Sequence, residues 1–308
     1  MKNSEQTYLT LVLLISIFLG SCKSQPDLGT APMPDDYQQE FQDWHNFRVD
    51  VLTAPTGWLR LVDLQWLQSG ENRFGSGPGS DIRFPEGSIT ENTGIFDYSE
   101  GSVVMNVADG VSIYHEGESV NRFQLYDGEN QPEVTHNNLI WYVDVRDDQV
   151  GIRIYSSETP KADSFDGFPR YPIQEEWYKK ALFLQYDEPK IMEVDDVIGR
   201  KNEVISPGQL QFSVNGELYT LDAIESSGRL FIMFSDLTNR DETYQAGRYM
   251  LVPYPEEGKE TTILDFNKAY NPPCAFSKFT TCMLPPPQNR LDLEIPAGEK
   301  RPVQFEGI

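Results

Sequence analysis

The chain has 308 residues, of which 39% are hydrophobic and 12% aromatic, so it can build a packed core and is not a disordered protein. Its 25 Lys and Arg residues against 48 Asp and Glu residues give a formal net charge of −23, which repels phosphate backbones; we expect no nucleic-acid partner. Three cysteines are too few for a scaffold held by many disulfides.

The N-terminus predicts an export signal. An apolar run from Leu9 to Leu19 is too short to span a membrane as a helix but suits the core of a secretory signal. It ends in Leu19-Gly20-Ser21-Cys22, which resembles a bacterial lipobox. We therefore expect residues 1–21 to be a lipoprotein signal peptide and Cys22 to be acylated, anchoring the protein to a bacterial membrane of the cell envelope. The alternative is an ordinary signal with an incidental cysteine.

A tether and a helix are expected next. Residues 22–34 are rich in Pro, Gly and small polar residues, which is typical of a flexible linker. Residues 35–53 predict an amphipathic helix, with Asp35 or Asp36 as its N-cap. Its apolar positions recur at spacings of four and three: Tyr37, Phe41, Trp44, Phe47 and Val51. His45 and Arg48 flank this stripe, and we expect both at the surface or its boundary.

The rest of the chain predicts short antiparallel strands separated by Gly, Asn, Asp and Pro. The candidate strands are residues 103–108, 111–115, 139–145, 150–155, 181–186, 209–214, 217–221, 230–234, 247–253 and 262–266. Asn215-Gly216 predicts a two-residue hairpin turn. Because no long helices alternate with the strands, a parallel doubly wound sheet is not expected. We predict a mainly β fold in two parts, residues 35–160 and 161–308.

The first part resembles the opening of a forkhead-associated β-sandwich. The resemblance lies in Gly70-Glu71-Asn72, Phe74-Gly75 and Ser80-Asp81-Ile82-Arg83-Phe84-Pro85. It implies an N-terminal β-sandwich. Such domains hold phosphothreonine with an arginine beside the early glycine and a later Ser-x-x-His. Here Ser76 follows Gly75, the histidine motif is missing and the net charge opposes phosphate, so we do not expect phosphopeptide binding.

No familiar catalytic or cofactor motif occurs: there is no nucleophile elbow, P-loop, His-Glu-x-x-His or Cys-x-x-Cys. The three histidines lie far apart in the sequence. Two acidic turns, Asp163-x-x-Asp166-Gly167 and Asp236-x-Thr238-x-Arg240-x-Glu242, lack the full alternation of a calcium loop and are more typical of solvated turns. We expect no metal and no cofactor.

The densest set of polar side chains lies between Asp265 and Lys300. Prolines in this segment fix φ and remove backbone donors, which favours a rigid, irregular loop suited to recognition or catalysis. The candidate binding or catalytic residues are Arg248, Asp265, Asn267, Tyr270, Asn271, Asn289, Arg290 and Glu299. The alternative is structural, because Asn side chains cap turns and an Arg–Glu pair can pin a loop.

Several blocks resemble domain-of-unknown-function family 1684. The first are Gly57-Trp58-Leu59-Arg60-Leu61 and Gly70-Glu71-Asn72-x-Phe74-Gly75. The last are Asp265-Phe266-Asn267-x-Ala269-Tyr270-Asn271-Pro272-x-Cys274-Ala275-Phe276, Cys282-x-Leu284-Pro285-Pro286, Asn289-Arg290-Leu291 and Ala297-Gly298-Glu299-Lys300. The resemblance spans residues 44–300. It implies membership of that family and no particular activity.

Three functions fit these residues. The first is a binding module for a small polar ligand or glycan, since aromatic faces and Asn or Arg forks suit sugars and carboxylates. The second is a hydrolase, in which Asp265 or Glu299 is the base and Arg248 or Arg290 stabilises developing negative charge. The third is a structural or assembly lipoprotein without a small-molecule site.

Cys274 and Cys282 are the thiols that remain once lipidation consumes Cys22. An even pair in an exported protein suggests a disulfide. The loop between them can close if the two Cα atoms lie within about 7 Å of each other. The alternatives are two buried free cysteines or a metal site with two thiolates.

Overall fold

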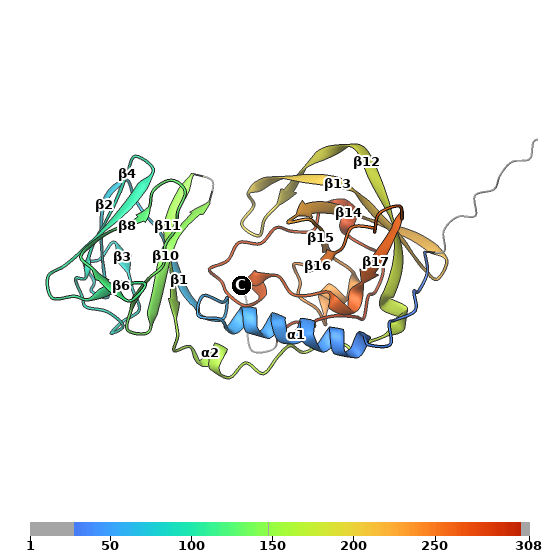
Figure 1. Ribbon diagram of the computed structural model, residues 1–308, viewed down its shortest axis with the longest axis horizontal. Helices are drawn as coiled ribbons and strands as arrows, with labels where there is room; N and C mark the ends of the chain where they lie inside the picture. Colours follow the sequence, from blue (N-terminus) through green and yellow to red (C-terminus); the bar gives the residue numbers. More distant parts are fainter. Residues whose placement is uncertain (1–27, 147, 303–308) are drawn as a thin grey trace, which may run out of the picture.

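The computed structural model describes residues 28–146 and 148–302, which form two β regions and one long helix (Figure 1). The predicted signal peptide, Cys22 and most of the tether lie outside these residues. Of the helices that the structure describes, none is long and apolar enough to cross a membrane. The predicted mainly antiparallel β fold with one N-terminal helix is confirmed.

The helix, α1 (Tyr37–Thr53), begins after Asp36, and its buried face departs from the predicted one only in the C-terminal half. Tyr37, Phe41 and Leu52 are buried, whereas Phe47 and Val51 are 63% and 41% exposed. The packed stripe thus continues from Phe41 through Trp44 and Arg48 to Leu52. The sequence prediction followed the apolar residues and placed Arg48 at the surface or its boundary. Arg48 is indeed only partly buried, but its guanidinium is paired with the buried carboxylate of Glu299, which the prediction did not include.

The first β region is a sandwich of two sheets (Figure 1, left). One sheet has the order β1-β11-β10-β9-β6-β7, and the other β3-β2-β4-β5-β8. The strands are β1 (Leu61–Trp66), β2 (Gly70–Gly75), β3 (Ile82–Arg83), β4 (Gly94–Ser99), β5 (Ser102–Val107), β6 (Ile113–His115), β7 (Glu118–Val120), β8 (Arg122–Tyr126), β9 (Val134–His136), β10 (Leu139–Arg146) and β11 (Gln149–Ser156).

Side chains from both sheets fill the space between them. Phe74 and Phe96 stack with ring centroids 4.0 Å apart, and Trp141 of β10 is fully buried beside them. Along β10 the inward residues alternate with outward polar ones such as Tyr142 and Asp144, as expected for a sheet with one face in a core. All of β11 except Gln149 is buried on both faces, so its outer face is covered as well.

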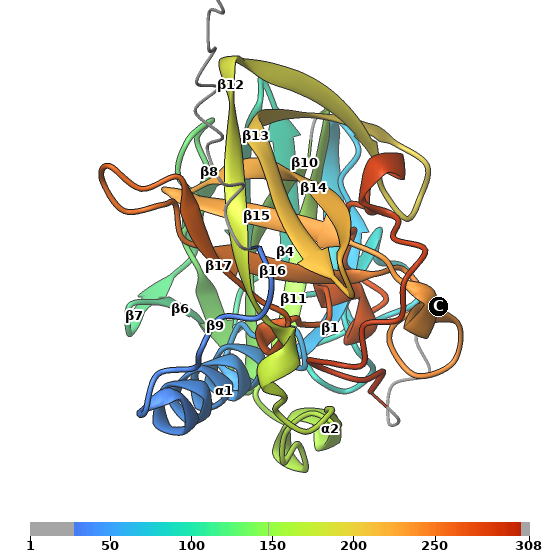
Figure 2. The ribbon, with the colours of Figure 1, turned by 90° about the vertical axis from the view of Figure 1, so that its right-hand side faces the viewer.

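The second β region is one strongly curved antiparallel sheet of order β16-β15-β14-β13-β12-β17 (Figure 2). Its strands are β12 (Tyr178–Asp195), β13 (Lys201–Val214), β14 (Glu217–Ser226), β15 (Arg229–Phe234), β16 (Arg248–Val252) and β17 (Thr261–Asp265). Inside the curve, Phe266 packs against Phe212 and Phe234, with ring centroids 5.3 Å and 5.5 Å from its own. Asn215 and Gly216 have φ values of 52° and 85°, which makes the predicted turn a type I′ hairpin.

The hairpin of β12 and β13 is much longer than predicted. The prediction ended the first strand at Tyr186, before Asp187, Glu188 and Pro189, and began the next strand at Gln209. In the structure the strand passes through these residues, and the pairing with β13 shifts register between Gln185 and Lys190. A bulge therefore absorbs the proline without ending the strand.

Short helices complete the chain. They are α2 (Pro160–Asp163), η1 (Glu175–Trp177), η2 (Leu237–Arg240), η3 (Phe266–Lys268), η4 (Pro273–Ala275) and η5 (Pro287–Asn289). The chain leaves the sandwich at Ser156 and passes α2 before it enters the second region. α1 precedes the sandwich in sequence but packs on the second region, where the Tyr37 hydroxyl donates to Asp265 at 2.7 Å (Figure 1).

Candidate functional site

Arg48 of α1 and Glu299 near the C-terminal end form the centre of the candidate site. The guanidinium Nη2 lies 3.1 Å and 3.2 Å from the two carboxylate oxygens, and Nε lies 3.2 Å from Oε1. Burial raises the pKa of Glu299, although Arg48 acts in the opposite direction. The pair also fixes Asn271, whose backbone N–H donates to Glu299 Oε2 at 2.7 Å and whose carbonyl accepts from Arg48.

A close backbone approach makes this arrangement possible. Gly298 has a φ of 79°, and a Cβ at this position would lie 2.5 Å from the carbonyl oxygen of Ala269. Glycine is therefore required here, since other residues would be both strained and obstructed. The Glu299 N–H then donates to the same carbonyl at 2.8 Å, which places its side chain under residues 269–271.

Tyr270 stands directly over this ion pair. The Arg48 Cζ lies 4.4 Å from the centroid of its ring, a cation–π contact, and burial raises the pKa of its hydroxyl to about 12. Its backbone pairs with Tyr249 of β16 through two hydrogen bonds of 2.9 Å. Both the ring and the backbone of Tyr270 are thus held in place.

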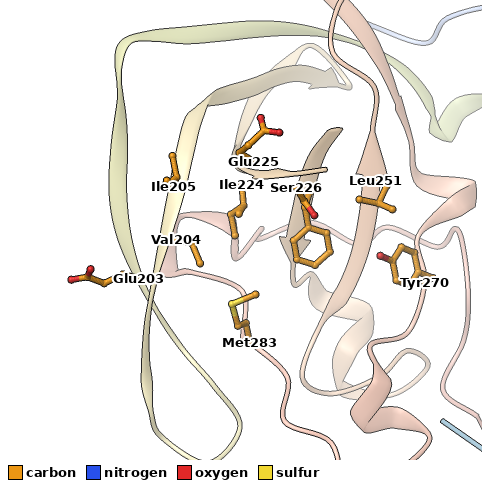
Figure 3. Close-up of a pocket in the computed structure, with 10 residues that line it drawn as sticks. Glu203, Val204, Ile205, Ile224, Glu225, Ser226, Leu251, Tyr270 and Met283 are labelled. Atoms are coloured by element: carbon orange, nitrogen blue, oxygen red, sulfur yellow. The ribbon is translucent and has the colours of Figure 1, made fainter. Parts of the chain in front are cut away.

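Two adjoining hollows open at this cluster and share Phe231 and Tyr270. The smaller, of about 260 Å³, is walled by aromatic and apolar side chains with Arg48 and Asn271 at its base. The larger, of about 580 Å³, is a groove between β13 and β14, past the point where the two strands separate. Figure 3 shows Val204, Ile224 and Met283 at its centre, with Glu203 and Glu225 at its edges.

One polar atom at this site lacks a partner. Asn271 donates from its side-chain nitrogen to the carbonyl of Lys300 at 2.9 Å, but among the described residues its buried Oδ1 accepts no hydrogen bond. A buried acceptor without a donor is costly. A ligand hydroxyl or N–H would satisfy it.

The structure separates the other predicted residues from this cluster. Arg248 is fully buried and donates from Nη2 to Asp236 at 2.6 Å and to the Ile295 carbonyl at 3.0 Å. Asp236 also caps η2, so this acidic turn is a structural element. Arg290 is exposed.

Asn289, Asn267 and Asp265 act as structural links. The amide of Asn289 binds the N–H and carbonyl of Asp222 and the carbonyl of Met233, and so joins β14 to β15. Asn267 makes the same paired contact with the backbone of Gln174. Asp265 accepts from Tyr37 and from Asn267, and burial raises its pKa.

These contacts bear on the hydrolase hypothesis. Glu299 is held by Arg48, Arg248 is held by Asp236, and Asp265 shares no partner with Glu299 among the described contacts. Glu299, Arg248 and Asp265 are thus each engaged in a structural contact of their own, whereas Arg290 is exposed. Of the predicted residues, the structure brings together Tyr270, Asn271 and Glu299.

Cys274 and Cys282 are joined by a disulfide, with Cα atoms 6.1 Å apart. The bridge lies directly after Asn271 and is buried beneath Tyr244, whose hydroxyl donates to the Cys274 carbonyl at 3.1 Å. In residues 28–146 and 148–302, no three His, Cys, Asp or Glu side chains lie together as a metal site.

Sequence reasoning missed Arg48 and the rings of Trp58 and Phe231 at the site. Arg48 lies eleven residues after Tyr37, close to three helical turns, which places it on the packed face. That spacing was the available signal. Phe231 carried none, since strand alternation does not indicate which face lines a groove.

A family model described as "Protein of unknown function (DUF1684)" matches residues 163–300. The predicted family is thereby confirmed for this part of the chain, and the blocks at residues 57–75 lie outside the match. No curated protein matches the chain.

Solved structures give weaker similarities. A solution NMR structure of an uncharacterized protein of Haloarcula marismortui is 28% identical, with a TM-score of 0.40, and the match covers 47% of this chain and 82% of that one. The FhaA FHA domain complexed with the intracellular domain of Rv3910 is 16% identical, with a TM-score of 0.20 over 30% of this chain and 96% of that one. A structure from a study of phosphothreonine-dependent FHA domain interactions has the same identity and score, with 92% of its chain covered. At these TM-scores, none of the three bears on ligand or activity.

Proposed function

Because residues 163–300 belong to the DUF1684 family, whose function is unknown, we propose a function from the site itself: the protein binds a small polar ligand or glycan between Arg48, Tyr270 and the adjoining groove. The observation that carries this proposal is the pair of hollows that share Phe231 and Tyr270. Their sizes of about 260 Å³ and 580 Å³ suit an elongated small molecule.

The chemistry of the lining favours a hydroxyl-rich ligand. The rings of Tyr270 and Phe231 offer flat apolar faces on which a sugar ring can stack. The unpartnered Oδ1 of Asn271 offers an acceptor for a hydroxyl group. Arg48 has its charge compensated by Glu299, so the site does not require an anionic ligand.

The proposed setting is the cell envelope. The lipobox-like sequence before Cys22 supports a lipoprotein whose signal is removed and whose acyl groups, palmitate among them, anchor it to a bacterial membrane. The described body would then present the groove to the adjacent aqueous compartment. The structural or assembly alternative lacks such a specific observation.

A glycan array followed by calorimetry tests the proposal. We expect at least one glycan to bind saturably, and Tyr270→Ala to weaken it by about tenfold or more, equivalent to about 1.4 kcal/mol. Tyr270→Phe, which keeps the ring, is expected to bind within about threefold of the wild type. Tyr114→Ala, a half-exposed tyrosine on β6, is the matched control and should change nothing. No binding at millimolar glycan, or equal affinity in Tyr270→Ala, would contradict the proposal.

A further inference from the structure

A third hollow, of about 350 Å³, lies between the two β regions and differs in charge from the groove. Its chemistry-bearing walls come from both regions: Trp66 of β1, Arg146 of β10, and Lys278, Phe279, Thr280 and Thr281 of the loop closed by the disulfide. Among the described residues no Asp or Glu lines it, although the chain holds 48 of them. It is thus a basic pocket in a strongly acidic protein.

The cations beside this pocket outnumber their carboxylates. Arg146 Nε and Arg153 Nη2 lie 2.8 Å and 3.0 Å from the same oxygen, Oδ2 of Asp144. In the described part of the chain, two guanidinium groups therefore share one carboxylate. Burial lowers the pKa of Arg146; Asp144 acts in the opposite direction, and the charges of Arg153 and Arg200 act in the same direction as burial. An anion in the pocket would relieve this repulsion.

Lys278 adds a second available cation. Within the part of the chain that the structure describes, no carboxylate lies within 4.0 Å of its ammonium group. The positive charge of Lys278 acts to lower the pKa of Asp63. The hydrogen bonds of that carboxylate come instead from the Leu64 N–H and the Gln65 amide. Lys278 is exposed and lies 5.0 Å from the ring centroid of Phe279.

Hydroxyl and aromatic groups complete the recognition set. Thr281 Oγ1 accepts a hydrogen bond from Arg146, which leaves its own proton to donate. Trp66 lies under the Arg146 guanidinium, with Cζ 5.8 Å from the ring centroid. Each cation therefore stands beside a flat ring, an arrangement that fits a charged group attached to a planar body.

We propose that this pocket binds a small molecule that carries an oxyanion, a carboxylate or phosphate, on a planar or aromatic body. The oxyanion lies between Lys278, Arg146 and the Thr281 hydroxyl, and the planar body lies against Trp66 or Phe279. The site is separate from the groove at Tyr270, so the two proposals stand or fall independently.

The test uses phenyl phosphate, benzoate, inorganic phosphate and phenol, followed by calorimetry and tryptophan fluorescence. We expect phenyl phosphate or benzoate to bind saturably, phenol to bind about tenfold more weakly or not at all, and affinity to fall as salt rises from about 20 to 150 mM. If inorganic phosphate bound as tightly as phenyl phosphate, the result would support an oxyanion site but contradict the proposed contact with a planar body.

Two variants make the outcome decisive. Lys278→Ala, at an exposed position, should weaken phenyl phosphate by about tenfold. Lys259→Ala is the matched control, since Lys259 is exposed and paired with Glu256. Thr281→Val should also weaken binding while it keeps the side-chain volume. Lack of saturation by every probe at about 10 mM, or equal losses in the two lysine variants, would overturn the proposal.

Discussion

At the residue scale, the environment of a side chain decides its role more than its type does. Arg48, Arg146 and Arg248 are all guanidinium groups in ion pairs, yet only Arg248 is fully enclosed by its partners. Arg48 lines a hollow while paired with Glu299, and Arg146 shares its carboxylate with a second arginine. Arg248 is therefore structural, whereas Arg48 and Arg146 each line a hollow and are the arginines that our two binding proposals use.

A pH-dependent stability is expected from His45, which neighbours Arg48 on α1. Burial, with the charges of Arg170 and Arg48, lowers the pKa of His45 below 6.5. The unfolded chain then takes up this proton at a higher pH than the folded chain, so the protein loses stability as the pH falls through about 6.5.

His45→Gln removes the titrating imidazole, so the free energy of unfolding of this variant should depend less steeply on pH between about 7.5 and 5 than that of the wild type. Denaturant unfolding at several pH values measures the slope. NMR titration of the imidazole provides the direct control, and a His45 pKa at or above 6.5 would contradict the prediction.

At the element scale, the loop from Ala269 to Met283 carries parts of both proposed sites. Tyr270 and Asn271 line the hollow of about 260 Å³, and Lys278 to Thr281 line the basic pocket between the two β regions. The disulfide between Cys274 and Cys282 closes the second of these segments into a short ring. The covalent link restricts the conformations of the unfolded chain, and so it stabilises the folded conformation of this irregular loop.

Thiol titration tests whether the disulfide between Cys274 and Cys282 forms. In a Cys22→Ser variant, the denatured and unreduced protein should show no free thiol, and two after reduction. Cys274→Ser with Cys282→Ser should lower the free energy of unfolding by about 2–3 kcal/mol on the loop-entropy model. Two free thiols without reductant would contradict the disulfide, and an unchanged stability would contradict its energetic role.

At the scale of the whole molecule, Arg60 ties the two β regions together. Its Nε donates to the Thr53 carbonyl at the end of α1 at 2.9 Å, and its Nη1 donates to the Ser157 carbonyl at 2.6 Å. The same nitrogen lies 3.2 Å from Asp163 of α2. The chain enters the sandwich after Thr53 and leaves it near Ser157, and the guanidinium of Arg60 binds both of these segments.

Arg60→Ala should lower the free energy of unfolding by about 1–2 kcal/mol, since the carbonyls of Thr53 and Ser157 lose a charged donor. Calorimetry should show the single transition broaden or split as the two regions uncouple. Arg73→Ala is the matched control, because Arg73 is exposed and lies 3.9 Å from Asp81, and it should cost about 0.5 kcal/mol or less. An Arg60→Ala protein that melts like the wild type would contradict the coupling.

The local signals in the sequence determined the β class, the two-residue hairpin turn at Asn215-Gly216 and the start of α1, because strand alternation, turn chemistry and helix spacing depend on near neighbours. They also singled out Tyr270, Asn271 and Glu299. Only the tertiary structure decided that Arg48, 251 residues away from Glu299 in the chain, completes that cluster, and that Asp265, Asn289 and Arg248 bind backbone and buried partners instead. The same polar residue can hold a loop or line a pocket, and which of these it does depends on partners that chain folding brings from distant positions.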